Sequence, residues 1–206
     1  MAGRRRSSRT AGRQRADHQD RARKSCVLRA ALAGHEKVLG PEHPHTAQCL
    51  NSLAVLLRNQ GDHTGARPLF ERALAIREKA LGPEHPNTAT SLNNLASLLQ
   101  AQGDLAGARP LYERALAAWE KTLGPEHPNT NRVRRHLATV LLAGGETDKA
   151  LEFGHAALAA HDKSLGSDHA WTRDSARVTA NALDALGRAE EAAAMRLRHH
   201  LKDPAK

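Results

Sequence analysis

Leucine and alanine recur along most of this chain at the spacing of amphipathic helices. Leu50, Leu53 and Leu57 follow the i, i+3, i+7 pattern of one helix face, and the same pattern returns in residues 92–99. A second apolar stretch, at residues 69–76, follows the first after a short polar turn. Apolar residues at this spacing indicate helices that bury one face. Each unit of the chain is therefore predicted to be a helical hairpin.

The hairpins belong to a repeat with a period of 42 residues. The segment GPEHP begins at Gly40, Gly82 and Gly124, and a diverged copy, GSDHA, begins at Gly166. A fixed period of this size is typical of stacked repeats that bury their apolar faces against one another. The first helices of the three full repeats are predicted near residues 45–59, 87–101 and 129–143.

The linkers carry the signals that end one helix and start the next. Gly82 is placed to end a helix, Pro83 to prevent its continuation and Pro86 to start the next helix with its angle preset. Between the paired helices, Asp62 and Asp104 are placed to begin the second helix. One histidine recurs in every linker, and each is expected to bond a linker backbone or a helix end: His43, His85, His127 and His169.

Two further motifs carry a resemblance to a known family. The steps Ala66-x-x-x-Phe70 and Ala108-x-x-x-Tyr112 resemble the second helix of a tetratricopeptide repeat. The 42-residue period, LNNLA, ARPLYERAL and the LGPEHP linker are similar to the long-period subclass of kinesin light chains and many bacterial repeat proteins. The resemblance covers roughly residues 25–195. It implies an all-α fold, a right-handed superhelical solenoid of antiparallel helix pairs.

The repeat register divides the chain into seven segments. The predicted segments are a disordered Arg-rich leader (1–20), a lone second helix of an incomplete repeat (21–39), three repeats (40–81, 82–123 and 124–165), a degenerate capping repeat (166–202) and a frayed tail (203–206). In the capping repeat we expect Arg196 and its basic neighbours to face water, because a terminal unit loses its outer apolar stripe. His199 and His200 are expected as a pair on opposite sides of a helix.

The lone helix should leave apolar residues without their usual partner. Val27, Leu28 and Leu32 would lack a first helix on one side. Three candidates could take that place. They are a second copy of the chain, which would give self-association, the leader, and residues lost by truncation. The sequence leaves these alternatives open.

The positive charge is concentrated before the repeats. Residues 1–24 contain nine basic and two acidic residues, so +7 of the formal net charge of +9 lies there and +2 in the rest. The leader has no Leu, Ile, Val or aromatic residue and cannot bury enough surface to fold. The leader is either solvated without a partner, or it attaches the protein to nucleic acid or another polyanion by electrostatic attraction. Polyanion binding through the leader, with the solenoid as a spacer or dimeriser, is the alternative function of the protein. The first reading is favoured because no aromatic residue interleaves the arginines.

No motif for catalysis, cofactor binding or metal binding stands out. Linker histidines of adjacent repeats are expected about 10 Å or more apart, too far to share an ion with Zn–N bonds of about 2 Å. Cys26 and Cys49 match no ligand spacing and are interpreted as reduced thiols of a cytoplasmic protein. No apolar run is long enough for a membrane span. We therefore predict a non-enzyme without cofactors.

The remaining candidate site is the inner surface of the array. The resemblance implies that first helices line a concave face that holds peptides. The matching positions are Gln48, Asn51, Thr90, Asn93, Asn94, Ser97, Arg132, Arg135, His136, Arg177 and Asn181. Asparagine amides suit a peptide backbone, and arginines suit carboxylates. The prediction is a protein-interaction scaffold or adaptor that binds an extended, acidic protein or peptide segment. The alternative is that these residues are merely the solvated face of a helix.

The third repeat departs from the leucine pattern of the others. Arg134 stands where Leu50 and Leu92 are core, so it must either reach solvent or pair with an acid, and it is expected to loosen that repeat. Arg132, Arg135 and His136 should form one basic patch.

Overall fold

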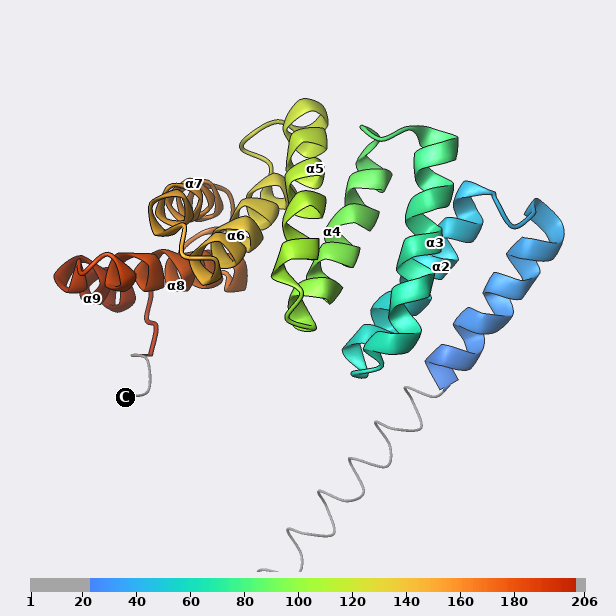
Figure 1. Cartoon of the computed structure of the whole chain (residues 1–206), viewed down its shortest axis with the longest axis horizontal. Helices are drawn as coiled ribbons and strands as arrows, with labels where there is room; N and C mark the ends of the chain where they lie inside the picture. The colour runs from blue at the N-terminus through green and yellow to red at the C-terminus, as the bar shows by residue number, and fades with distance from the viewer. Residues whose placement is uncertain (1–22, 203–206) are drawn as a thin grey trace, which may run out of the picture. The chain divides into compact units, whose positions relative to one another are not determined.

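The computed structural model describes residues 23–202, and the described part of the chain is built from helices without any strand (Figure 1). The predicted leader (1–20) and the predicted frayed tail (203–206) both lie outside these residues. The chain divides into two compact units, Met1–Ala80 and Leu81–Lys206, which are described separately below.

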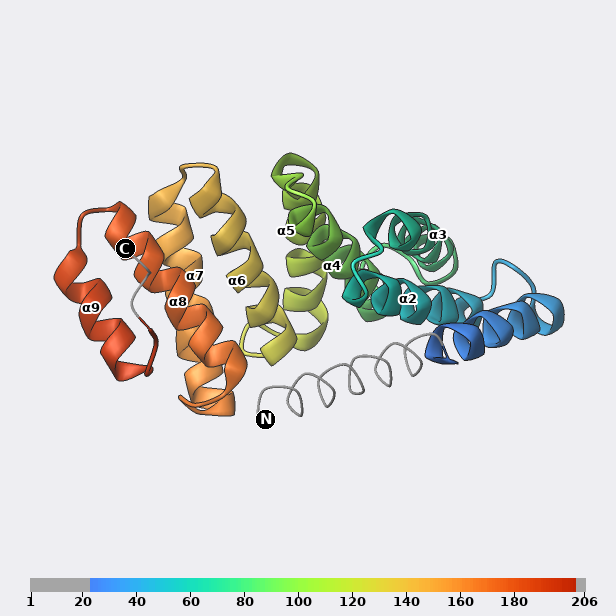
Figure 2. The ribbon, with the colours of Figure 1, turned by 90° about the horizontal axis from the view of Figure 1, so that it is seen from below.

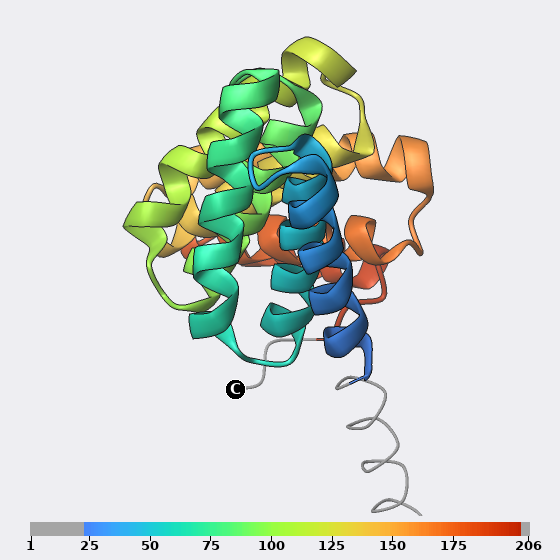
Figure 3. The same ribbon diagram turned by 90° about the vertical axis from the view of Figure 1, so that its right-hand side faces the viewer.

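The described part of the first unit holds three helices. They are the N-terminal helix, described at residues 23–39, α2 at Pro44–Asn59 and α3 at His63–Leu81. Ala47 and Leu50 of α2 pack with Ala73 and Ile76 of α3, and Leu32 of the N-terminal helix packs against this cluster. The N-terminal helix accordingly lies alongside the α2–α3 hairpin (Figure 3).

The second unit is a stack of three hairpins. Its helices are α4 at Pro86–Ala101, α5 at Leu105–Leu123, α6 at Pro128–Ala143, α7 at Thr147–Leu165, α8 at Ala170–Ala185 and α9 at Ala189–Arg198 (Figure 2). Each helix packs against the next in the sequence. The first helices also approach one another, α4 against α6 and α6 against α8, whereas α5, α7 and α9 do not. The first helices therefore form the inner side of this unit.

The linkers form as the sequence predicts. Gly82 and Gly124 have φ of 89° and 87°, a left-handed conformation that favours glycine and ends the preceding helix. The Nδ1 atom of His85 accepts a hydrogen bond from the backbone N–H of Asn87 at 3.0 Å and caps α4. The same cap forms in the other three linkers. The predicted structural role of these histidines is confirmed.

Two further linker contacts are repeated that the sequence analysis did not identify. Thr88 donates its hydroxyl hydrogen to the carbonyl of Gly82 at 2.8 Å, and the threonines in register at the other linkers do the same. Lys163 pairs with Glu126 at 3.1 Å, and the matching Lys–Glu pairs form at the two preceding linkers. The linker thus has the same shape each time because the same side chains bond it.

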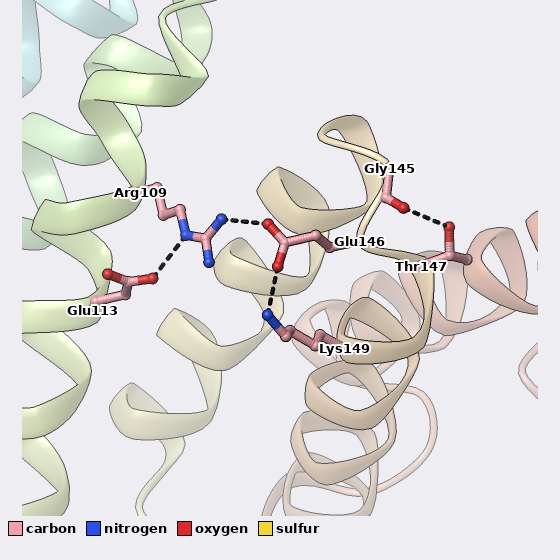
Figure 4. A network of polar contacts seen from close by, with 6 residues as sticks. All are labelled: Arg109, Glu113, Gly145, Glu146, Thr147 and Lys149. Atoms are coloured by element: carbon pink, nitrogen blue, oxygen red, sulfur yellow. Dashed lines mark hydrogen bonds and ion pairs between the residues drawn. The ribbon is translucent and has the colours of Figure 1, made fainter.

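The turns inside the hairpins are capped by aspartate in the first two repeats. Asp62 and Asp104 each accept a hydrogen bond at 2.9 Å from the backbone N–H three residues on. The third repeat has Glu146 at this position, and its side chain makes no cap. Glu146 instead bonds Arg109 of the preceding hairpin and Lys149 of its own helix, which lowers the pKa of its carboxyl (Figure 4). The longer side chain therefore links two repeats.

Gly154 marks an unusually close approach of two helices in the third repeat. It stands where the earlier repeats have Phe70 and Tyr112. A Cβ atom at Gly154 would lie 2.7 Å from Oγ1 and 3.4 Å from Cα of Thr179 in α8. Because glycine has no side chain, α8 packs directly onto α7 at this point.

The end of the chain corrects two predictions. Arg196 does not face water: it is 7 % exposed and pairs with Asp184, because it occupies the buried position of Phe70 and Tyr112 and takes an acid from its own hairpin. His199 and His200 are not a pair on a helix, since α9 ends at Arg198. His199 is 3 % exposed, and His200 has a positive φ of 51°.

Candidate functional site

The predicted basic residues Arg132, Arg135 and His136 lie on α6, one of the first helices of the second unit. Arg135 is half-buried, and its guanidinium contacts the imidazole of His136, with 3.2 Å between Nη2 and Nε2. Its Nε atom is buried and has no hydrogen-bond partner among the described residues. Burial lowers the pKa of Arg135, and the carboxylate of Asp174 offsets part of this effect. The site therefore holds a cation that is partly removed from water.

Aromatic rings lie beside the two predicted neighbours of Arg135, His136 and Arg132. The ring of His136 stacks on Tyr112 of α5, with centroids 5.1 Å apart and planes 4° apart. Arg132 lies over the ring of Trp171 at 5.1 Å and over that of Trp119 at 6.0 Å. Such cation–π contacts hold a guanidinium without neutralising it.

The residues predicted on α8 form an ion pair or a hydrogen bond with nearby side chains. Arg177 is exposed and pairs with Asp174 at 3.0 Å. Asn181 is also exposed, and its Oδ1 accepts a hydrogen bond from Arg196 at 3.4 Å. Arg177 is close enough to Arg135 for the two charges to repel. Arg135 and Arg177 therefore form one basic region, with Asp174 beside it.

The residues predicted on α4 differ in accessibility. Thr90 donates to the carbonyl of Pro86 at 2.9 Å, and Asn94 and Ser97 are half-buried. Asn93 is only 4 % exposed, and its Oδ1 has no partner among the described residues. Asn93 is therefore less available to a ligand than its place in the repeat suggests.

The two residues predicted in the first unit are described by themselves. Gln48 is exposed and accepts a hydrogen bond from Arg77 at 2.8 Å. Asn51 is 8 % exposed. Like Asn93, it is largely covered and therefore less available to a ligand than predicted.

Arg134 takes one of the two courses predicted for it. Its guanidinium pairs with Glu120 at 2.6 Å and donates to the carbonyl of Pro125 and to Asn131, both at 2.9 Å. An arginine at a leucine position is thus accommodated because its donors have partners. It does not belong to the basic patch.

The tryptophans are the residues of this site that the sequence analysis missed. Trp119 donates its indole N–H to the carbonyl of Pro86, and His161, in register with it, bonds the carbonyl of Pro128. Trp171 follows the last linker histidine, where Asn129 stands one repeat earlier. An aromatic residue where other copies are polar was the available signal.

The described residues offer no arrangement for metal chemistry. No group of three or more His, Cys, Asp or Glu side chains in residues 23–202 is placed to hold an ion. Cys49 lies 2.8 Å from Nδ1 of His35, and burial raises the pKa of its thiol. Within the same residues, no helix is both long and apolar enough to cross a membrane.

The second unit has the architecture of a helical repeat protein, a stack of antiparallel helix pairs with one set of helices on the inner side. The sequence model of the family Tetratricopeptide repeat matches four overlapping segments, residues 27–77, 51–118, 90–154 and 132–197. The chain belongs to the tetratricopeptide repeat family. The predictions of this family and of an all-α solenoid of antiparallel helix pairs are confirmed.

Solved structures add the subclass. A protein of Podosopora anserina described as a kinesin light chain with nearly identical TPR-like repeats is 29% identical, with 95% of this chain and 92% of that chain covered and a TM-score of 0.76. BtubC (BKLC) from P. vanneervenii is 21% identical over 93% of this chain and 80% of its own, with a TM-score of 0.80. The second shows the fold alone. No curated protein matches the chain in sequence. The repeats are of the kinesin-light-chain-like kind.

Proposed function

We propose that this protein is a non-catalytic scaffold that binds an extended, acidic peptide segment of a partner on the inner side of its second unit. Proteins of the tetratricopeptide repeat family generally mediate protein–protein interactions. The observation that carries the acidic specificity is Arg135, a half-buried guanidinium whose Nε lacks a partner among the described residues.

A carboxylate suits this site better than a neutral group. Burial has removed part of the hydration of Arg135, so an incoming carboxylate meets a cation with less water to displace. Arg177 is exposed nearby and adds a second positive charge, while the carboxylate of Asp174 opposes them. Two arginines against one acid leave the region net positive.

The helix next to it supplies groups for a peptide backbone. Asn94 and Ser97 of α4, a helix that approaches α6, are half-buried and bring an amide and a hydroxyl. An amide both donates and accepts, and therefore matches a peptide N–H and C=O without selecting a side chain. The α4 residues would hold the chain of the ligand while the α6 and α8 arginines select its charge. The cytoplasm stays the proposed location, on the sequence argument from its two unmatched cysteines.

The test is a fluorescence titration with acidic and neutral peptides of equal length at low and high salt. Replacing Arg135 and Arg177 by glutamate should weaken binding of the acidic peptide by tenfold or more, since a hydrogen bond to a charged group contributes about 1.5–3 kcal/mol. Arg177→Glu alone reports on an exposed residue whose change leaves the fold intact. Arg114→Glu, on the exposed side of α5, is the matched control.

Two outcomes would contradict the proposal. One is equal affinity for acidic and neutral peptides, and the other is acidic-peptide binding that survives the double reversal. Deletion of residues 1–20 separates the alternative of polyanion attachment through the leader, because peptide binding on the inner side should persist without the leader. Circular dichroism of each variant verifies that the helices remain.

A further inference from the structure

The N-terminal helix (residues 23–39) carries an apolar face that the described chain does not cover. Val27 is 62 % exposed and Val38 is 79 % exposed. They lie eleven residues apart, about three helical turns, and so share one face of the helix. With Leu39 at 40 %, this single helix supplies three of the five large hydrophobic residues that are exposed among the described residues.

The repeat register shows what covers this face elsewhere. Leu28 stands where the first two full repeats have Phe70 and Tyr112, both with 0 % exposure. Val27 stands where the first full repeat has Leu69, which packs against a cluster that includes residues of its first helix, α2. Tyr112 lies on a second helix, and its hydroxyl bonds Gln100 of the first helix of the same repeat. The N-terminal helix is in register with the second helices but has no first helix described before it. A first-helix-like partner is therefore the element that fits the part of the face around Val27 and Leu28.

The sequence of this helix is also more apolar near its C-terminal end than the other second helices are. Val38 stands where the other second helices carry small or polar residues that are exposed, Ala80, Thr122 and Ser164. Between Val27 and Val38, Gly34 has open space, since a Cβ added there would meet nothing within 4 Å. Small residues between apolar ones allow a second helix to approach closely.

The charges around this face are basic. A groove of about 410 Å³ is lined by Val27, Leu28 and Leu56 with Arg23 and Lys24 at its rim. Lys37 is exposed on the same helix, directly before Val38. Its one acid, Glu36, is already paired with Arg72 at 2.7 Å. The rim therefore complements acidic side chains.

We propose that this face docks an amphipathic helix of a partner protein, with leucines spaced as in residues 92–99 and acidic residues along its edges. The leader cannot supply it, because residues 1–20 contain no Leu, Ile, Val or aromatic residue. A second copy fits poorly, since its leucine stripes are buried in its own hairpins and its N-terminal helix is equally basic. This surface is separate from the proposed peptide site on α6 and α8.

The experiment uses the full chain and a fluorescein-labelled, helix-stapled peptide with the sequence of residues 86–101. Three flanking positions of the peptide, Asn87, Asn94 and Ser97, are changed to glutamate in one version and to lysine in another. The glutamate peptide should bind, with an affinity that falls as salt is raised. The lysine peptide should bind at least tenfold more weakly.

Val27→Asp tests the face directly. Val27 is largely exposed, so the change leaves the helix intact, yet it should weaken binding of the glutamate peptide by tenfold or more. Leu197→Asp, at a leucine of α9 that is 80 % exposed, is the matched control and should leave binding unchanged.

Three outcomes would overturn the proposal. Equal binding of the glutamate and lysine peptides removes the charge argument. Binding that is undiminished by Val27→Asp places the peptide elsewhere, such as on the basic leader. A dimer of the full chain that Val27→Asp dissociates, seen by light scattering, would assign the face to a second copy instead.

Discussion

The linker histidines offer the sharpest test of how the repeats are held. His85 occupies the N-cap position of α4, with φ of −69° and ψ of 140°, and its Nδ1 accepts the backbone N–H of Asn87 at 3.0 Å. Removal of the ring leaves that N–H without its acceptor. Loss of an N-cap acceptor costs about 0.5–2 kcal/mol, typically about 1 kcal/mol. We expect His85→Ala to destabilise the protein by about that amount.

The change is measurable by urea unfolding followed through helical circular dichroism. With a slope of about 1–3 kcal/mol per molar urea, a loss of about 1 kcal/mol lowers the midpoint by roughly 0.3–1 M. His85→Asn supplies a preferred capping group and should restore most of the loss. His63→Ala, at the first residue of α3, is the matched control, because no hydrogen bond of its side chain is seen among the described residues.

The caps should also add. The four linker histidines lie in different repeats, so their effects should sum to about 4 kcal/mol in the quadruple alanine variant. That is a large share of the about 5–15 kcal/mol typical of native proteins. The capping role would be refuted if His85→Ala unfolds at the wild-type midpoint, or if asparagine proves as damaging as alanine.

Two further predictions concern packing and pH. Gly154→Ala should destabilise the third repeat, because overpacking against Thr179 costs about 1–3 kcal/mol and the gain in helix propensity is about 1 kcal/mol. Thr179→Ala in the same chain should relieve the overpacking. A urea midpoint that rises with Gly154→Ala alone would contradict this prediction. Burial lowers the pKa of His161 and of His199, so the folded state binds fewer protons than the unfolded chain and stability should fall as the pH drops below about 6.5. Urea unfolding across this range tests the sign, His161→Gln should flatten the dependence, and a stability that rises on acidification would be inconsistent with it.

The sequence by itself determined the helices and their punctuation. The first helices were predicted near 45–59 and 87–101, and α2 and α4 begin one residue earlier at Pro44 and Pro86. The reason is local: glycine ends a helix, proline starts one and histidine caps it within a few residues of chain. Because the same signals recur at a fixed period, the bounds of a helix predicted in one repeat can be compared with those predicted in the others.

Only the tertiary structure decided which side chains meet between repeats. Arg132 lies between Trp119 and Trp171, which are 52 residues apart in the sequence, and no local pattern pairs them. Arg196 is polar in the sequence, yet the register places it inside the hairpin beside Asp184. The availability of Arg135 and the near burial of Asn93 likewise depend on how closely adjacent helices approach. That distance is set by the packing of the whole stack and not by any one repeat.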